Sequence, residues 1–467
     1  MTQLTAMDAA FLYMESETQQ MQVCGVMILD PAGGEGYSAS RFRRVLEERA
    51  HLVPAFGRKL RAVPLNLDHP YWTPEDALDL DAHYHRIDCP APGDDRALGR
   101  IVGDIASTLL DRSRPLFEVW LIEGLTGGRV ALVAKVHHST MYGTASANMM
   151  AQLLDLSPEV RDVSGEDAPV HEEPPSAATV LGHAALHTAT MPLRIGRGLL
   201  GGVGRVGGLV GFAAGQLRNR GEGKLTLRAP RTSVNGPITA QREAAFVGVP
   251  FADVRAVRKA HGTKINDVVL ALVTDALRQY LLKRGGVPDR PMIAGVPQIV
   301  AAGQNAGTDT LSTLLVPLPV GEEDPVAQLQ QIAAFSEQSK QMGDLMGPET
   351  IAGVAQLVPP PVVVGGMKAY RGLRIGKLLS LPPLLSLIVS NVQGPPIPLW
   401  CAGAKLVSLF PFGPLLPGTG LNVTVLSNMG NLDIGLMACP DLVDDVWEIV
   451  EAMPKTLARL LEDAPRN

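Results

Sequence analysis

The chain has 467 residues, which at roughly 150 residues per domain allows two or three domains and excludes a small disulfide or zinc module. Hydrophobic residues make up 46% of the chain, charged residues 19% and aromatic residues only 4%, so its apolar character comes mainly from aliphatic and small side chains. The formal net charge is −6, which gives no general attraction for nucleic acid and argues against DNA or RNA as a partner.

The cysteines and the first residues indicate a cytoplasmic protein. Four cysteines are spread along the chain without a Cys-x-x-Cys pair: Cys24, Cys89, Cys401 and Cys439. This spacing argues against a zinc site and against a disulfide framework. The N-terminus lacks the basic start and apolar core of a secretory signal peptide. No stretch reaches the ~18 continuous apolar residues of a membrane span, so we expect only peripheral membrane contact.

Residues 1–160 predict a first folded half that mixes strands and helices. A strand is expected over residues 21–30, and helices are expected over 38–52 and 94–112. The segments FEVWLIEGL and RVALVAKVHH, separated by a Thr-Gly-Gly turn, predict a β-hairpin.

Residues 161–240 have the composition of a linker. An acidic, proline-containing stretch precedes a glycine-rich apolar segment that contains several arginines. Because glycine costs a helix about 1 kcal/mol relative to alanine, this segment needs external packing to be helical. Two interpretations stay open: a helix packed closely on another backbone, or an interfacial segment whose arginines bind anionic headgroups.

Residues 241–467 predict a second mixed half. Strands are expected over 242–250, 311–318, 387–392 and within 421–437, and helices over 251–261, 266–284 and 444–463. No sequence repeat relates the two halves. The simplest architecture is therefore an α+β protein with two halves joined by a long crossover.

The motif KVHHSTMYG, at residues 135–143, is the strongest candidate for chemistry, because a predicted strand ends there in a glycine-containing turn. Neighbouring strand residues point to opposite faces, so His137 and His138 cannot easily share one metal ion or one substrate. One of them should act alone. A purely structural histidine pair is the alternative, although side chains at such positions often contact ligands.

Three further segments that contain asparagine each have a structural explanation when considered alone. Asn235 lies in an Asn-Gly-Pro turn, Asn391 precedes a Gly-Pro-Pro turn, and Asn266 suits a helix N-cap beside Asp267. Neither a P-loop nor a Gly-x-Ser-x-Gly nucleophile motif occurs.

Read together and in order, these segments resemble the bacterial wax ester synthase/diacylglycerol acyltransferase family. The resemblance covers nearly the whole chain apart from the linker. It implies the fold of CoA-dependent acyltransferases, in which two chloramphenicol-acetyltransferase-like halves enclose a tunnel. This agrees with the two halves expected from the pattern of strands and helices.

The signature of that family is His-His-x-x-x-Asp-Gly, and His137, His138 and Gly143 match it while Tyr142 replaces the Asp. The resemblance implies that His138 is the general base and that His137 supports it. Imidazole suits this role because it is mostly neutral at pH 7, and a positioned base contributes about 10² to 10⁴ in rate. The family's Asp is an orienting group, so its loss need not abolish the chemistry.

The remaining matches to the family are Asn235, Asp267 and Asn391, together with Asn266 as a candidate oxyanion donor or structural residue. Residues 294–303 lack the Arg that the family usually has after Val-Pro. Because a buried ion pair is more easily lost as a unit than singly, we hypothesise that Tyr142 and this Arg-less loop are linked changes.

The resemblance implies an acyl-CoA-dependent O-acyltransferase. It would esterify diacylglycerol, or a long-chain alcohol, to triacylglycerol or wax ester and release CoA. Neither a metal nor a bound cofactor is expected. The expected location is the inner face of the membrane or a lipid-droplet surface. The alternative is a catalytically impaired relative that binds lipid or acyl-CoA, because Tyr142 replaces the motif Asp.

Overall fold

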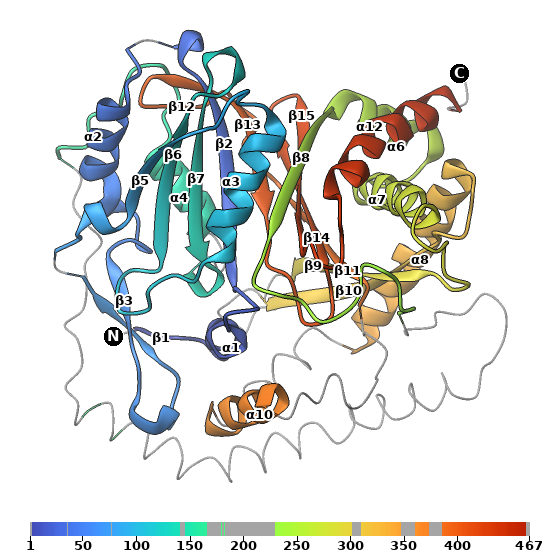
Figure 1. The fold of residues 1–467 in the computed structure, drawn as a ribbon, viewed down its shortest axis with the longest axis horizontal. Helices are drawn as coiled ribbons and strands as arrows, with labels where there is room; N and C mark the ends of the chain where they lie inside the picture. Colours follow the sequence, from blue (N-terminus) through green and yellow to red (C-terminus); the bar gives the residue numbers. More distant parts are fainter. Residues whose placement is uncertain are drawn as a thin grey trace.

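The computed structural model describes residues 2–34, 36–75, 77–140, 145–165, 179, 182, 229–300, 310–346, 360–372 and 385–463. These residues form two six-stranded sheets in contact with each other, with helices packed on them (Figure 1). A small three-stranded sheet lies beside the first large one. No helix in these ranges is long and apolar enough to span a membrane.

The first large sheet contains the hairpin that carries the His-His motif. Its strands are, in spatial order, β12 (Trp400–Cys401), β13 (Ala404–Phe412), β2 (Gln22–Asp30), β7 (Val130–His137), β6 (Phe117–Glu123) and β5 (Tyr84–Asp88). The predicted hairpin is confirmed, since β6 and β7 pair antiparallel. Strand β2 pairs with the other edge of β7 and places Gln22 opposite His137. The helices of this half are α2 (Ala39–Arg49), α3 (Asp95–Ser107) and α4 (Ala145–Leu153).

The second large sheet belongs to the C-terminal half. Its strands are, in spatial order, β10 (Thr310–Leu318), β9 (Met292–Val300), β11 (Leu387–Val392), β14 (Leu421–Asn428), β15 (Asn431–Ala438) and β8 (Glu243–Pro250). Its helices are α6 (Phe251–His261), α7 (Ile265–Leu282), α8 (Pro325–Met346) and α12 (Val446–Glu462). Helix α7 is buried along most of its length because α8 and α12 pack against it. The α+β class and the mixed C-terminal half are confirmed.

The small sheet holds the N-terminal segment near the His-His motif. It consists of β1 (Thr2–Gln3), β4 (Tyr71–Pro74) and β3 (Arg58–Arg61), in that order. Helix α1 (Ala6–Met14) follows β1 and contacts the turn after β7, and helix α10 (Pro360–Gly372) contacts α1 (Figure 1).

The two halves share strands and a close helix–strand contact. Strands β12 and β13 come from the C-terminal part of the sequence but complete the first sheet, where β13 pairs with β2. Helix α3 lies against β8 at Gly99 and Gly103, where an added Cβ atom would stand 2.3 Å from the Ala244 carbonyl oxygen and 2.4 Å from that of Arg242. Glycine is needed here because any side chain would overlap the neighbouring backbone. Segments from both halves of the sequence therefore build the first sheet, and the two halves are in close contact.

Two expected elements differ from those observed, and some observed helices were not expected. The helix predicted over 94–112 ends at Ser107, because Thr108 turns extended and its hydroxyl accepts a hydrogen bond from the buried Lys135 Nζ at 2.7 Å. The strand segment within 421–437 is two strands separated by a turn at Met429, which has a φ of 51°. Helices α1 and α8 were not predicted. The glycine-rich segment lies outside the described residues.

Candidate functional site

The His-His motif occupies the end of β7 and a single turn after it. Strand β7 is buried throughout and ends at His137, and His138 begins the 3₁₀ turn η6 (His138–Thr140). The His137 N–H donates to the Leu116 carbonyl at 3.0 Å, and the His138 N–H donates to the Met21 carbonyl at 2.8 Å. The backbone of both histidines is thus fixed by the segments on either side of β7.

The His138 ring stacks on Phe11 of α1, with ring centroids 4.0 Å apart and planes 23° from parallel. The residue keeps some accessible surface, but protein surrounds most of the ring. Burial therefore lowers the pKa of His138 from its usual 6.5 to about 4, and the neighbouring His137 adds a smaller lowering effect. The imidazole is unprotonated at pH 7 and able to accept a proton.

The His137 ring has a different set of neighbours and is fully buried. Its Nδ1 accepts the Ser139 N–H at 3.1 Å and lies 2.8 Å from the Ser139 hydroxyl. Its Nε2 lies 3.2 Å from Glu15 Oε1, an electrostatic contact whose alignment falls short of a regular hydrogen bond. The two rings therefore have different partners, Phe11 for His138 and Ser139 and Glu15 for His137.

Glu15 and Phe11 are site residues that the sequence did not predict. Both lie at or just after α1, more than a hundred residues before the motif, and neither forms a pattern with it in the sequence. Glu15 is buried and is also bound by Arg112, whose Nη2 lies 2.8 Å from Glu15 Oε2.

Asn266 and Asp267 lie in the first turn of α7. The N-cap residue of that helix is Lys264, so the N-cap alternative for Asn266 is wrong. Asp267 Oδ2 accepts the Lys264 N–H at 2.9 Å and so has a capping role. A carboxylate suits this place because the first N–H groups of a helix have no partner within the helix.

Asn235 and Asn391 have structural surroundings. The Asn235 amide donates to the carbonyls of Ser386 at 2.9 Å and Gly418 at 3.1 Å, which joins the chain before β8 to the chain before β11 and β14. Asn391 is exposed on β11 opposite Val425. None of the contacts described for these two residues, or for Asp267, involves His137 or His138. Tyr142, Gly143 and residues 301–303 of the Arg-less loop lie outside the described residues. The hypothesis that Tyr142 and this loop are linked changes therefore stays a prediction.

A cavity of about 880 Å³ lies at the C-terminal end of α4, the first helix after the His-His motif. Most of its wall is apolar, and the apolar residues include Met150, Leu154, Leu156, Val160, Ile397 and Leu399. This volume lies within the range of about 300 to 1,000 Å³ that is usual for small-molecule sites. The described residues contain no group of three His, Cys, Asp or Glu side chains suited to a metal ion.

Comparison with protein families finds two matches in the order of the chain. Residues 4–269 match the wax ester synthase/diacylglycerol acyltransferase catalytic domain, and residues 309–461 match the C-terminal domain of the same family. Two proteins of Mycobacterium tuberculosis, both named as diacylglycerol O-acyltransferases, are 36% and 33% identical to this chain. The alignments cover 99% and 97% of this chain and 90% and 94% of theirs.

Solved structures show the same fold. The wax ester synthase/diacylglycerol acyltransferase from Marinobacter aquaeolei VT8 is 26% identical, covers both chains completely and has a TM-score of 0.69. The first condensation domain of the calcium-dependent antibiotic synthetase is 14% identical, with a TM-score of 0.56 over 100% of this chain and 98% of that one, and shows the fold alone. The two family matches and the relatives establish that this chain belongs to the wax ester synthase/diacylglycerol acyltransferase family.

Proposed function

We propose that the protein transfers the acyl group of acyl-CoA to the hydroxyl of diacylglycerol or of a long-chain alcohol. The products are triacylglycerol or wax ester and free CoA. The observation that carries the proposal is the position of His138 directly after β7, with its ring stacked on Phe11, in a chain of this family. The comparisons give no support to the alternative of a catalytically impaired relative.

The reaction needs a base and an activated acyl donor. His138 takes the proton of the acceptor hydroxyl while that oxygen attacks the thioester carbonyl. The tetrahedral intermediate then expels the CoA thiolate, which receives the proton from the imidazolium of His138. Because a thioester is already activated, the proposal calls for no metal ion and no bound cofactor.

The cavity beside α4 supports a substrate with a long hydrocarbon chain. Helix α4 begins seven residues after His138, and a helix rises about 1.5 Å per residue, so Met150 lies roughly 8 Å along the helix from Ala145. The apolar wall gives the hydrocarbon chain a place out of water.

We also propose that the protein acts from the cytoplasm on a membrane or lipid-droplet surface. Leu65 is 84% exposed in the short turn η3 (Pro64–Asn66), and Val362 is 58% exposed on α10, which contacts both that turn and α1. Exposed apolar side chains gathered near the helix that bears Phe11 suit contact with lipid. Co-sedimentation with anionic vesicles should fall for Leu65→Asp and stay unchanged for Leu282→Asp, a control Leu that is 53% exposed at the end of α7.

The deciding experiment incubates purified protein with radiolabelled palmitoyl-CoA and either dioleoylglycerol or hexadecanol, followed by separation of the lipids. Labelled triacylglycerol or wax ester, with stoichiometric release of free thiol, is the expected result. Binding of palmitoyl-CoA without ester from either acceptor would contradict the proposal and favour a lipid-binding relative. The ratio of the two esters identifies the preferred acceptor.

A further inference from the structure

A polar cluster around the buried side chains of Glu15 and His137 adjoins His138 in the chain and has no role in the reaction as described so far. Its members are the side chains of Glu15, His137 and Arg112 and the backbone of Met21. The Glu15 side chain is 3% exposed and that of His137 0%. A polar group removed from water in this way is costly unless its partners are in place, so the arrangement is a specific one.

The hydrogen bonds of His137 determine its tautomer. The Ser139 N–H can only donate, and it donates to His137 Nδ1, so Nδ1 carries a lone pair. In the neutral ring the proton is then on Nε2. That nitrogen faces Glu15 Oε1 at 3.2 Å, so the carboxylate stabilises the Nε2–H form.

Glu15 is ionised at neutral pH. Burial alone would raise its pKa, but the contacts with His137 and Arg112 outweigh burial and lower the pKa below the usual value. Arg112 donates to Glu15 Oε2 from Nε at 3.1 Å and from Nη2 at 2.8 Å. The other oxygen, Oε1, is left for His137 and for the Met21 N–H at 3.3 Å.

Glu15 is connected to His138 by three short routes. Its carboxylate contacts His137, the residue before His138 in the chain. The same carboxylate accepts the Met21 N–H, and the Met21 carbonyl accepts the His138 N–H. Its own N–H bonds to the carbonyl of Phe11, whose ring stacks on that of His138. All three routes end on the backbone or the ring of the proposed base.

We propose that Glu15 is a positioning residue for the acyl transfer. It holds the ring of His137 and the turn η6, and thereby sets the direction of the His138 ring. This inference rests on the proposed function. Because a misplacement of about 1 Å in an active site can cost about 10²-fold in rate, a group that acts only through His138 can still govern turnover.

The test compares Glu15→Gln with wild-type enzyme in the ester assay. We expect kcat to fall at least tenfold while KM for palmitoyl-CoA stays within about twofold, because the base is misdirected and the substrate contacts are kept. Nitrogen-15 NMR of the histidine rings should show shifted His138 resonances in the variant, because the orientation of that ring changes, whereas the Ser139 N–H still donates to Nδ1 and keeps His137 in the Nε2–H form.

Asp275→Asn is the matched control. The Asp275 side chain is 2% exposed in α7 and accepts the Thr456 hydroxyl at 2.6 Å, so the variant also neutralises a buried, hydrogen-bonded carboxylate. It should lower the melting temperature without lowering kcat. If Glu15→Gln does not fold, the double variant Glu15→Gln/Arg112→Gln, which removes the carboxylate together with its half-exposed cation, is measured instead and should show the same loss of kcat.

Three results would overturn the inference: wild-type kcat in the folded Glu15 variant, unchanged His138 ring resonances in that variant, or an equal loss of kcat in Asp275→Asn. Failure of the proposed function gives a different result, namely no ester from the wild-type enzyme.

Discussion

Two arginine–carboxylate contacts of equal length lie in very different surroundings. Arg112 Nη2 is 2.8 Å from Glu15 Oε2, and Arg96 Nη2 is 2.8 Å from Glu451 Oε1. The two arginine side chains are similarly exposed, at 44% for Arg112 and 45% for Arg96, but the Glu15 side chain is 3% exposed and that of Glu451 is 55% exposed. A buried carboxylate that loses its cation is left without compensation, while an exposed pair is worth about 0 to 1 kcal/mol. Burial of the carboxylate, not the distance, therefore decides how much each contact contributes.

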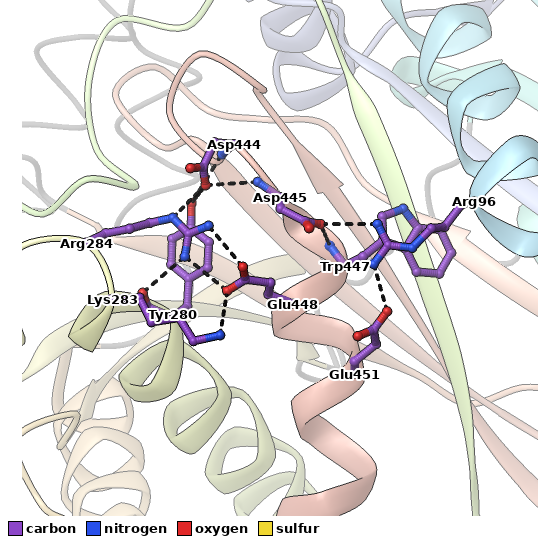
Figure 2. A network of polar contacts seen from close by, with 9 residues as sticks. All are labelled: Arg96, Tyr280, Lys283, Arg284, Asp444, Asp445, Trp447, Glu448 and Glu451. Carbon is purple, nitrogen blue, oxygen red and sulfur yellow. Dashed lines mark hydrogen bonds and ion pairs between the residues drawn. The ribbon is translucent and has the colours of Figure 1, made fainter.

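The exposed contact belongs to a surface network around the start of α12. Figure 2 shows Arg284 between Asp444 and Glu448, with its guanidinium over the Tyr280 ring at 3.9 Å. In the same view, Arg96 of α3 reaches Glu451 and lies over the Trp447 ring at 5.3 Å. The network joins α7 to α12 and the first half to the second. Because Arg284 and Arg96 each contact two carboxylates, the loss of one leaves the other in place.

The largest expected effect comes from His138→Ala, which removes the buried base itself. We expect kcat to fall by about 10² to 10⁴, with the fold intact because the backbone pairing at the end of β7 remains. Steady-state ester formation and circular dichroism measure both quantities. In the wild type, kcat/KM should stay level above about pH 5 and fall with an apparent pKa of about 4, because only the unprotonated imidazole accepts the proton.

Wild-type turnover in His138→Ala would contradict the assignment of the base. A fall of kcat/KM with an apparent pKa near 6.5 in the wild type would show that the base is not the buried His138 ring.

The second prediction concerns the buried pair of Arg49 and Asp155. Their side chains are 0% and 2% exposed and lie 2.7 Å apart, and the Asp155 backbone pairs with that of Trp400 in β12. Asp155→Ala should cost about 3 to 5 kcal/mol in the free energy of unfolding, because it leaves the Arg49 charge buried without its carboxylate. Urea unfolding measures this loss. The double variant Arg49→Met/Asp155→Leu should lose less, and an equal or greater loss would refute the explanation by uncompensated charge.

The third prediction concerns Asp433, a buried carboxyl without a cationic partner among the described residues. Burial raises its pKa from 3.8 to about 6, although Oδ2 accepts the Leu409 N–H at 2.7 Å and the Asn428 amide at 3.0 Å. Between these two pH values the folded state binds more protons than the unfolded state, so this group makes stability fall as pH rises. His138 has the opposite effect, because its folded pKa is lowered and stability rises with pH from about 4 to 6.5.

The contribution of Asp433 to the pH dependence of stability is obtained by comparing the wild type with Asp433→Asn. Asp433→Asn has no titrating carboxyl, whereas the effect of His138 is common to both. The stability of the variant relative to the wild type should therefore increase by roughly 2 to 3 kcal/mol from pH 4 to pH 7. Urea unfolding at unit steps of pH tests this, and a difference that does not change with pH would be evidence against the raised pKa.

The sequence predicted local features well because they leave local patterns. Alternating apolar residues predicted the β6–β7 hairpin, and the glycine-containing turn after it predicted that the strand ends at the His-His motif. The sequence did not predict that β13 joins the first sheet or that Glu15 lies beside His137. Both depend on contacts between residues more than a hundred positions apart, and such contacts leave no period in the sequence.

The smallest expected effect is that of Glu451→Gln in the exposed network. Arg96 keeps Asp445 at 3.7 Å and the Trp447 ring, and water solvates the freed guanidinium, so the free energy of unfolding should fall by less than about 1 kcal/mol. The remaining loss of stability should become smaller in 0.5 M salt, because salt limits the interaction between exposed charges to a few ångströms. Glu448→Gln, whose contacts to Lys283 and Arg284 do not cross between the halves, is the control. A loss of about 2 kcal/mol or more in Glu451→Gln alone would mean that this exposed contact holds α3 to α12. Burial of the carboxylate would then not decide how much a contact contributes at the junction of the two halves.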